Sequence, residues 1–139
     1  MRHVLVAIVI CGGLVAGCGS DGGDASNSSD QQQAADVAKR YLQAVVARDW
    51  KAACETRTRK ERTELSRLGG SCARALAAAF AGKQVTLFEG ARVGDVRIDG
   101  SKAGIDVLQP GQDEPVITLV AVREGATWRL EDVPDAQAP

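Results

Sequence analysis

Apolar residues along this chain recur first at helical spacing and later at strand spacing. From residue 34 to about residue 80 they return every three or four positions, which is typical of amphipathic helices. Each helix is expected to begin at a capping side chain, and the three candidates are Asp30 with Gln33, Asp49 and Ser71. The pattern predicts three helices, the second of which runs from Trp50 to the stop signal Gly69-Gly70.

After Gly82 the apolar period falls to two, as expected of strands with one buried face. The alternating sets are Val85/Leu87, Val96/Ile98, Ala103/Ile105/Val107, Val116/Thr118/Val120/Val122 and Trp128/Leu130. Asp99-Gly100 and Glu124-Gly125 each lie between two sets and predict hairpin turns, whereas residues 110–115 predict a longer loop. The sheet should therefore be antiparallel, with helices over one face, which is an α+β fold.

The first eighteen residues have the pattern of an export signal. Arg2 and His3 give a positive start, and residues 4–15 form a mostly apolar run. About a dozen residues are too few to span a bilayer, which needs roughly 20. An ordinary secretory peptide and a cytosolic apolar start are the alternative interpretations of such a segment.

The end of this segment, Val15-Ala16-Gly17-Cys18, resembles the lipobox of bacterial lipoproteins, which is an aliphatic residue, two small residues and a cysteine. The resemblance implies that residues 1–17 are a signal peptide that is removed, and that Cys18 receives lipid. Two long acyl chains anchor a protein stably where one is marginal. The expected location is the extracytoplasmic face of the cell membrane, held there by lipid on Cys18.

Composition bounds the remaining organisation of the chain. With 139 residues and a net charge of -1, one domain is expected and a strongly basic nucleic-acid binder is excluded. Residues 18–33 hold no aliphatic side chain larger than Ala and are expected to be the lipidated cysteine and a flexible tether. The domain should then span residues 34–134, followed by a tail over residues 135–139. Residues 56–67 hold five basic and two acidic side chains and are expected to form a solvated helix face rather than a contact with anionic lipid.

Helices followed by a hairpin sheet is the order of the nuclear transport factor 2-like cone fold, and two stretches resemble that family. Residues 40–50 resemble its aromatic, apolar first helix and Arg-Asp turn, and residues 124–130 resemble its closing strand with a Trp. Ala53-Cys54 and Ser71-Cys72-Ala73 resemble small actinobacterial lipoproteins of this type. The resemblance implies three N-terminal helices packed on a curved antiparallel sheet of four to five strands.

Cys54 and Cys72 are the two cysteines that remain once Cys11 leaves with the signal peptide and Cys18 is lipidated. An exported protein with one thiol pair is expected to oxidise it, so a structural disulfide is predicted. A redox pair and a metal site are the alternatives. The spacing is not CxxC, however, and the single histidine, His3, lies in the signal peptide.

A mature chain without histidine can form no Ser-His-Asp or Cys-His nucleophile and no His-ligated zinc site. No phosphate-binding glycine motif is present either, so neither metal nor cofactor is expected. Tyr41 is the one enzymatic hint, because some cone-fold enzymes of the ketosteroid isomerase-like and polyketide cyclase-like kinds place an oxyanion-donating Tyr there. No general base is expected to accompany Tyr41, because the strand acids Asp95, Asp99, Asp106 and Glu131 are out of phase with the inward positions. Asp132 alone is in phase, and it lies near the strand end.

The leading hypothesis is a non-catalytic module that binds a partner protein or a small apolar ligand, with Tyr41, Trp50 and Trp128 as candidate pocket-lining residues. One alternative is a ketosteroid isomerase-like or cyclase-like enzyme that uses Tyr41 in the cone pocket. The other is a structural accessory of an envelope complex, which would expose an apolar patch instead of a lined cavity.

Overall fold

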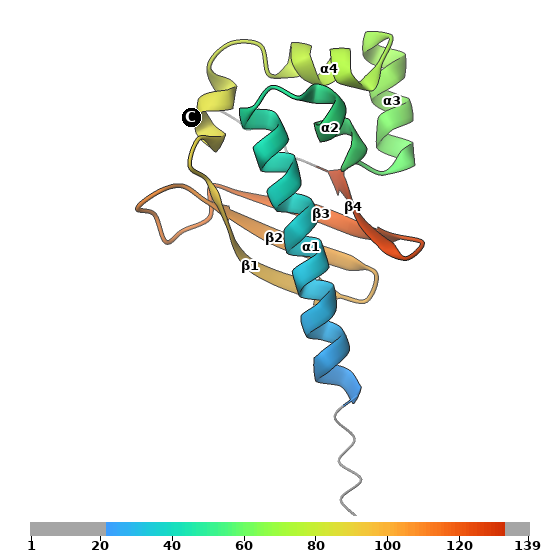
Figure 1. The fold of residues 1–139 in the computed structure, drawn as a ribbon, viewed down its shortest axis with the longest axis vertical. Coiled ribbons are helices and arrows are strands. Elements are labelled where there is room, and N and C mark those ends of the chain that lie inside the picture. Colours follow the sequence, from blue (N-terminus) through green and yellow to red (C-terminus); the bar gives the residue numbers. More distant parts are fainter. Residues whose placement is uncertain (1–21, 133–139) are drawn as a thin grey trace, which may run out of the picture.

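A computed structural model of the chain describes residues 22–132 (Figure 1). The predicted signal peptide, Cys18 and the tail over residues 135–139 lie outside the described residues. The elements follow in the order α1 (Gly22–Val46), α2 (Trp50–Glu55), α3 (Arg59–Gly69), α4 (Cys72–Ala79), the 3-10 helix η1 (Lys83–Phe88), β1 (Arg92–Asp99), β2 (Lys102–Leu108), β3 (Ile117–Glu124) and β4 (Thr127–Asp132).

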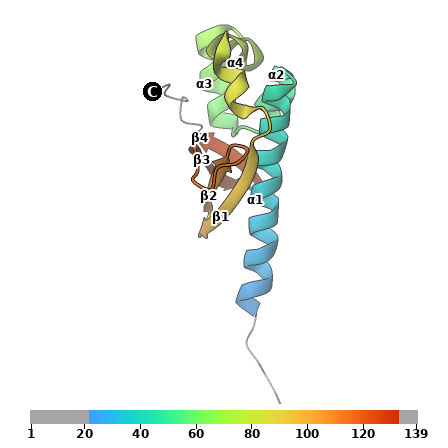
Figure 2. The same cartoon turned by 90° about the vertical axis from the view of Figure 1, so that its left-hand side faces the viewer.

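The four strands form one antiparallel sheet in the order β1-β2-β3-β4. Helix α1 crosses one face of the sheet, and α2, α3 and α4 gather beyond one end of it (Figures 1 and 2). The predicted hairpin turns are confirmed at Gly100 and Gly125, whose positive φ angles of 58° and 65° suit glycine. The α+β class, with helices packed on an antiparallel sheet, is therefore confirmed.

Helix α1 begins twelve residues before the predicted start of the domain at residue 34. Asp30, expected to cap the helix, lies inside it and forms an ion pair with Arg123 on β3. The Gln31 side chain donates a hydrogen bond to the carbonyl oxygen of Val96 at 3.1 Å. Helix α1 therefore covers part of the segment expected to be a flexible tether, and the polar side chains of Asp30 and Gln31 attach it to the sheet.

The second predicted helix is two helices, α2 and α3. Residues 56–58 leave the helical path and pair with β4, where Thr58 N donates to the Leu130 carbonyl and Leu130 N donates to the Thr56 carbonyl, both at 2.9 Å. The Thr58 side chain then caps α3 by accepting from Glu61 N. The described residues consequently hold four α-helices, where three were expected.

The two remaining cap predictions are confirmed. The Asp49 side chain accepts from Ala52 N at the start of α2, and the Ser71 side chain accepts from Arg74 N at the start of α4. Each satisfies a backbone donor that has no partner within its own helix. These caps place Cys54 and Cys72 on two short neighbouring helices.

Two strand predictions are wrong. Residues 83–88, which contain Val85 and Leu87, form the 3-10 helix η1, so the described sheet has four strands. In β3 the buried residues are Leu119 and Ala121, which pair with Ile105 and Ala103 of β2. Val120 and Val122 therefore lie on the outer face, which inverts the predicted phase of this strand. Both phases are apolar, so alternation alone does not decide between them.

Candidate functional site

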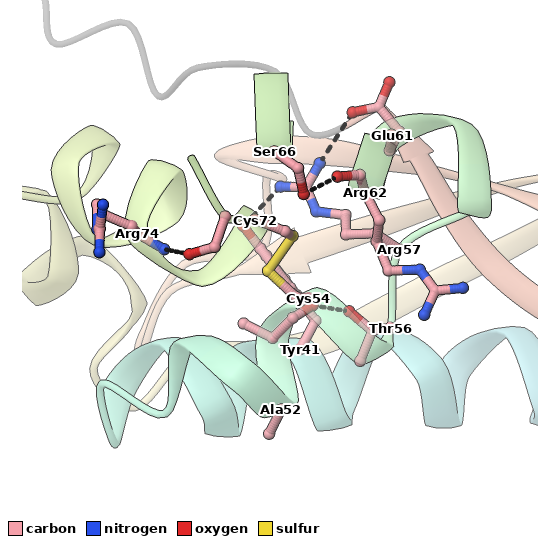
Figure 3. Close-up of a disulfide and its surroundings, with 12 residues drawn as sticks. Tyr41, Ala52, Cys54, Thr56, Arg57, Glu61, Arg62, Ser66, Cys72 and Arg74 are labelled. Atoms are coloured by element: carbon pink, nitrogen blue, oxygen red, sulfur yellow. Dashed lines mark hydrogen bonds and ion pairs between the residues drawn. A yellow bond between two sulfur atoms is a disulfide. The ribbon is translucent and has the colours of Figure 1, made fainter. Parts of the chain in front are cut away.

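The disulfide joins Cys54 of α2 to Cys72 of α4, with an S–S distance of 2.06 Å (Figure 3). Both residues are buried, with exposed fractions of 6% and 8%. Neither helix is long enough to be stable by itself, so their position depends on packing and on this bond. The geometry matches a structural link between the two helices.

A polar cluster of three residues lies beside the disulfide. Tyr41 is fully buried, and its hydroxyl accepts a hydrogen bond from Arg57 Nη2 at 3.2 Å. Arg57 Nη1 lies 3.6 Å from Glu61 Oε2, so one guanidinium group links the phenol to a carboxylate (Figure 3). We call this set the Tyr41–Arg57–Glu61 cluster. Among the described residues, Arg57 Nε has no hydrogen-bond partner.

Arg57 is the member that the sequence did not reveal. Its segment was expected to form a solvated helix face, yet its side chain is only 7% exposed. The reason is the pairing of residues 56–58 with β4, which turns Arg57 inward. Thr56 and Thr58 are buried beside it, whereas the part of the segment from Arg59 onward lies in α3, which contains no buried residue.

The three candidate pocket-lining residues do not share a pocket. Trp50 is half-buried and stacks on Phe80, with ring centroids 5.6 Å apart and planes inclined by 13°. Trp128 is 2% exposed, and the guanidinium carbon of Arg123 lies 5.3 Å from its ring centroid. Trp128 borders one open groove beside α1, whereas Tyr41 and Trp50 border none of the four grooves found on the described residues.

Side chains fill the space between α1 and the sheet, where a cone pocket would open. Tyr41 is the largest of the fully buried side chains, and it belongs to one core cluster with the buried aliphatic residues, the disulfide, Phe88 and Trp128. The largest fully buried side chains are Tyr41, Ile105, Leu119, Leu130, Val37, Val45 and Val107. A ligand could reach the Tyr41 hydroxyl only if these residues moved apart.

The acid of strand β2 lies on the outer face of the sheet, as its phase predicts. Asp106 accepts two hydrogen bonds from Arg97, at 2.6 and 2.8 Å, and one from Thr118 Oγ1 at 2.8 Å. The hydrogen bonds from Arg97 lower the pKa of Asp106 more than its partial burial raises it. Asp106 is held as a carboxylate on the side opposite Tyr41, so it cannot act as a general base for that phenol.

Two exterior grooves differ in character. We call the first the arginine groove; it lies among α1, α2, α3 and β4, measures about 650 Å³, and its charged lining residues are Arg40, Arg62, Arg129, Asp49 and Glu55. The second lies between α1 and the segment leading into β1, measures about 540 Å³, and its apolar lining residues are Leu42, Val46, Ala47, Phe88, Ala91 and Val93. Both grooves are open to solvent.

Within residues 22–132, no group of three or more His, Cys, Asp or Glu side chains could hold a metal ion. The helices of the same range are too short or too polar to cross a membrane. Compared with known proteins, the chain matches no family model and no curated protein.

Proposed function

We propose that this chain is a lipid-anchored, extracytoplasmic binding domain of the nuclear transport factor 2-like type, which docks a partner protein and catalyses no reaction. Anchoring is supported by the lipobox at Val15-Ala16-Gly17-Cys18. Export is supported by the bonded pair Cys54 and Cys72, since disulfides persist in oxidising compartments.

The observation that carries the binding role is the filled interior. Enzymes and small-ligand carriers surround most of their ligand with a cavity. Here Tyr41, Leu119 and Leu130 are fully buried between the helices and the sheet. The exterior grooves are open to solvent, and such surfaces suit a protein partner better than an apolar small molecule.

The two alternatives receive less support from the same contacts. For an isomerase, the Tyr41 hydroxyl would have to face a substrate and a base, but it faces Arg57. For a structural accessory, a contiguous apolar patch would be expected on the surface. The large exposed apolar side chains are Val46, Leu68, Leu87 and Val116, and of these only Val46 lines the apolar groove beside α1.

Lipidation is tested by labelling cells that express the full chain with radioactive palmitate. We expect the wild-type chain to take up label and to sediment with membranes, and Cys18→Ala to lose both properties. Cys11→Ala is the matched control, because it removes a cysteine from the same export segment and should leave labelling intact. Unchanged labelling and sedimentation of Cys18→Ala would refute the anchor.

A further inference from the structure

We infer that the arginine groove binds a carboxylate-bearing, acidic peptide segment of the partner protein, an inference that rests on the proposed docking function. The groove is defined by Arg40 of α1, Arg62 of α3 and Arg129 of β4. Three separate elements thus place a guanidinium group beside one open space. Guanidinium groups match carboxylates in shape and charge, and form paired hydrogen bonds with them.

The three arginines lack a carboxylate partner within the fold. No salt bridge joins them to an Asp or Glu among residues 22–132, although Asp49 and Glu55 line the same groove. Arg62 Nε is buried and has no hydrogen-bond partner in the described part of the chain. The same holds for Arg57 Nε and Trp128 Nε1, so this atom does not by itself point to a ligand. Arg40 is exposed, and it is the member of the set that an acceptor from outside reaches directly.

Three other arginines of this protein do have a carboxylate partner within the fold. Arg97 pairs with Asp106, Arg123 pairs with Asp30, and Arg57 pairs with Glu61. Each of these three contacts connects residues of the domain to one another. The arginines of the groove make contacts of a different kind, since Arg129 donates to the Glu55 carbonyl and Arg40 to the Asp36 carbonyl. Those backbone contacts hold the side chains in place without neutralising them.

The charge of the lining favours one carboxylate over a phosphate. Three arginines face two acids, and the Asp49 carboxylate is already bound to Ala52 N as a helix cap. The lining therefore carries a net charge of about +1, which one carboxylate neutralises. A phosphate dianion would leave an excess negative charge beside Glu55.

The test uses the full chain, purified in a non-ionic detergent, and as the probe a synthetic peptide that contains one glutamate and is acetylated and amidated at its ends. Binding is measured by titration calorimetry for the wild type, Arg62→Gln and Arg40→Gln. Arg67→Gln is the matched control, because it makes the same charge change on the exposed side of α3 and lies outside the groove. Arg40 is exposed, so its replacement keeps the test decisive even where Arg62→Gln destabilises the fold.

We expect the wild type to bind the peptide and each groove variant to bind it about tenfold more weakly, as the loss of a charged hydrogen bond implies. The Arg67→Gln affinity should stay within about twofold of wild type, because its charge is exposed and screened. No binding to the wild type, or an equal loss in Arg67→Gln, would overturn the inference. Inorganic phosphate that displaces the peptide at equal concentration would overturn the preference for carboxylate.

This outcome is separable from that of the lipid anchor. Calorimetry reports peptide binding by the purified chain whether or not Cys18 carries lipid. A chain that is labelled by palmitate but does not bind the peptide would contradict the groove alone. A chain that binds the peptide and is not labelled would contradict the anchor alone.

Discussion

Replacing Tyr41 with Phe removes one hydroxyl group and leaves the aromatic ring in its packed position. Tyr41 is fully buried, and Arg57 beside it is 6% exposed. The hydroxyl accepts from Arg57 Nη2, and Arg57 Nε already lacks a partner in the described residues. The substitution would therefore take an acceptor away from a buried cation.

The size of the effect follows from the geometry. A hydrogen bond to a charged group contributes about 1.5 to 3 kcal/mol, and a neutral pair about 0.5 to 1.5 kcal/mol. At 3.2 Å the contact is at the long end of N–H···O distances, which favours the lower part of the charged range. The guanidinium carbon lies 5.1 Å from the ring centroid, and Phe keeps that attraction. We expect Tyr41→Phe to lower the free energy of unfolding by about 1.5 to 2 kcal/mol.

Urea denaturation of the wild type and Tyr41→Phe measures this change directly, provided that the m-values agree. Arg57→Met and the double variant complete a mutant cycle. The coupling free energy between Tyr41 and Arg57 should be at least about 1 kcal/mol, since they contact each other directly. A loss below about 0.5 kcal/mol together with zero coupling would refute the cluster as a source of stability.

The same variant separates a structural Tyr41 from a catalytic one. An isomerase would lose about 10² to 10³ in rate with its oxyanion donor. Proton exchange on apolar ketones is the assay, with the wild type and Tyr41→Phe compared at equal folded fraction. We expect no turnover by either protein. Turnover that collapses in Tyr41→Phe while the fold persists would establish the enzyme instead.

Two further substitutions test the disulfide and the outer face. The double substitution Cys54→Ser and Cys72→Ser should lower the free energy of unfolding by about 3 kcal/mol, which is the chain-entropy value for a disulfide that joins residues 18 positions apart. In the native wild-type protein, neither cysteine should react with a thiol-labelling reagent before reduction. Because Arg97 lowers the folded-state pKa of Asp106, the stability gained from this pair is present above about pH 4 and is lost as the pH falls through that lowered pKa. Urea melts from pH 2 to 7 should show a shallower acid decline for Asp106→Asn than for the exposed control Asp113→Asn, and equal declines would contradict the assignment.

Local sequence signals predicted the parts of the fold that local interactions determine. Asp49 and Ser71 cap helices because each needs only a backbone donor three residues later. Gly100 and Gly125 form turns because their positive φ angles are available to glycine in any context. The cysteine count predicted the pair Cys54 and Cys72 in the same way, since it depends on parity and not on distance.

The features that the sequence did not predict depend on contacts between distant residues. Helix α1 begins at Gly22, earlier than predicted. In its early part Asp30 pairs with Arg123, which lies 93 residues away in the sequence. The phase of β3 is fixed by its register with β2, in which Leu119 opposes Ile105. If the register of β3 shifted by one residue, Val120 would be buried instead of Leu119. Both faces of the strand carry apolar residues, so the sequence does not favour one register over the other.

The break in the predicted helix at residues 56–58 also affects the arginine groove, which is the candidate binding surface. In one continuous solvated helix, Arg57 and Arg62 would both face water, as the charge pattern predicts. Pairing of Thr56 and Thr58 with Leu130 ends α2 and starts α3 with a new rotation. The two guanidinium groups then point in different directions (Figure 3). That of Arg57 enters the interior to satisfy Tyr41 and Glu61, while that of Arg62 borders the open groove with an unsatisfied donor. The short segment of residues 56–58 thus directs Arg57 into the buried cluster with Tyr41 and Glu61. It leaves Arg62 at the arginine groove, where we propose that a partner binds.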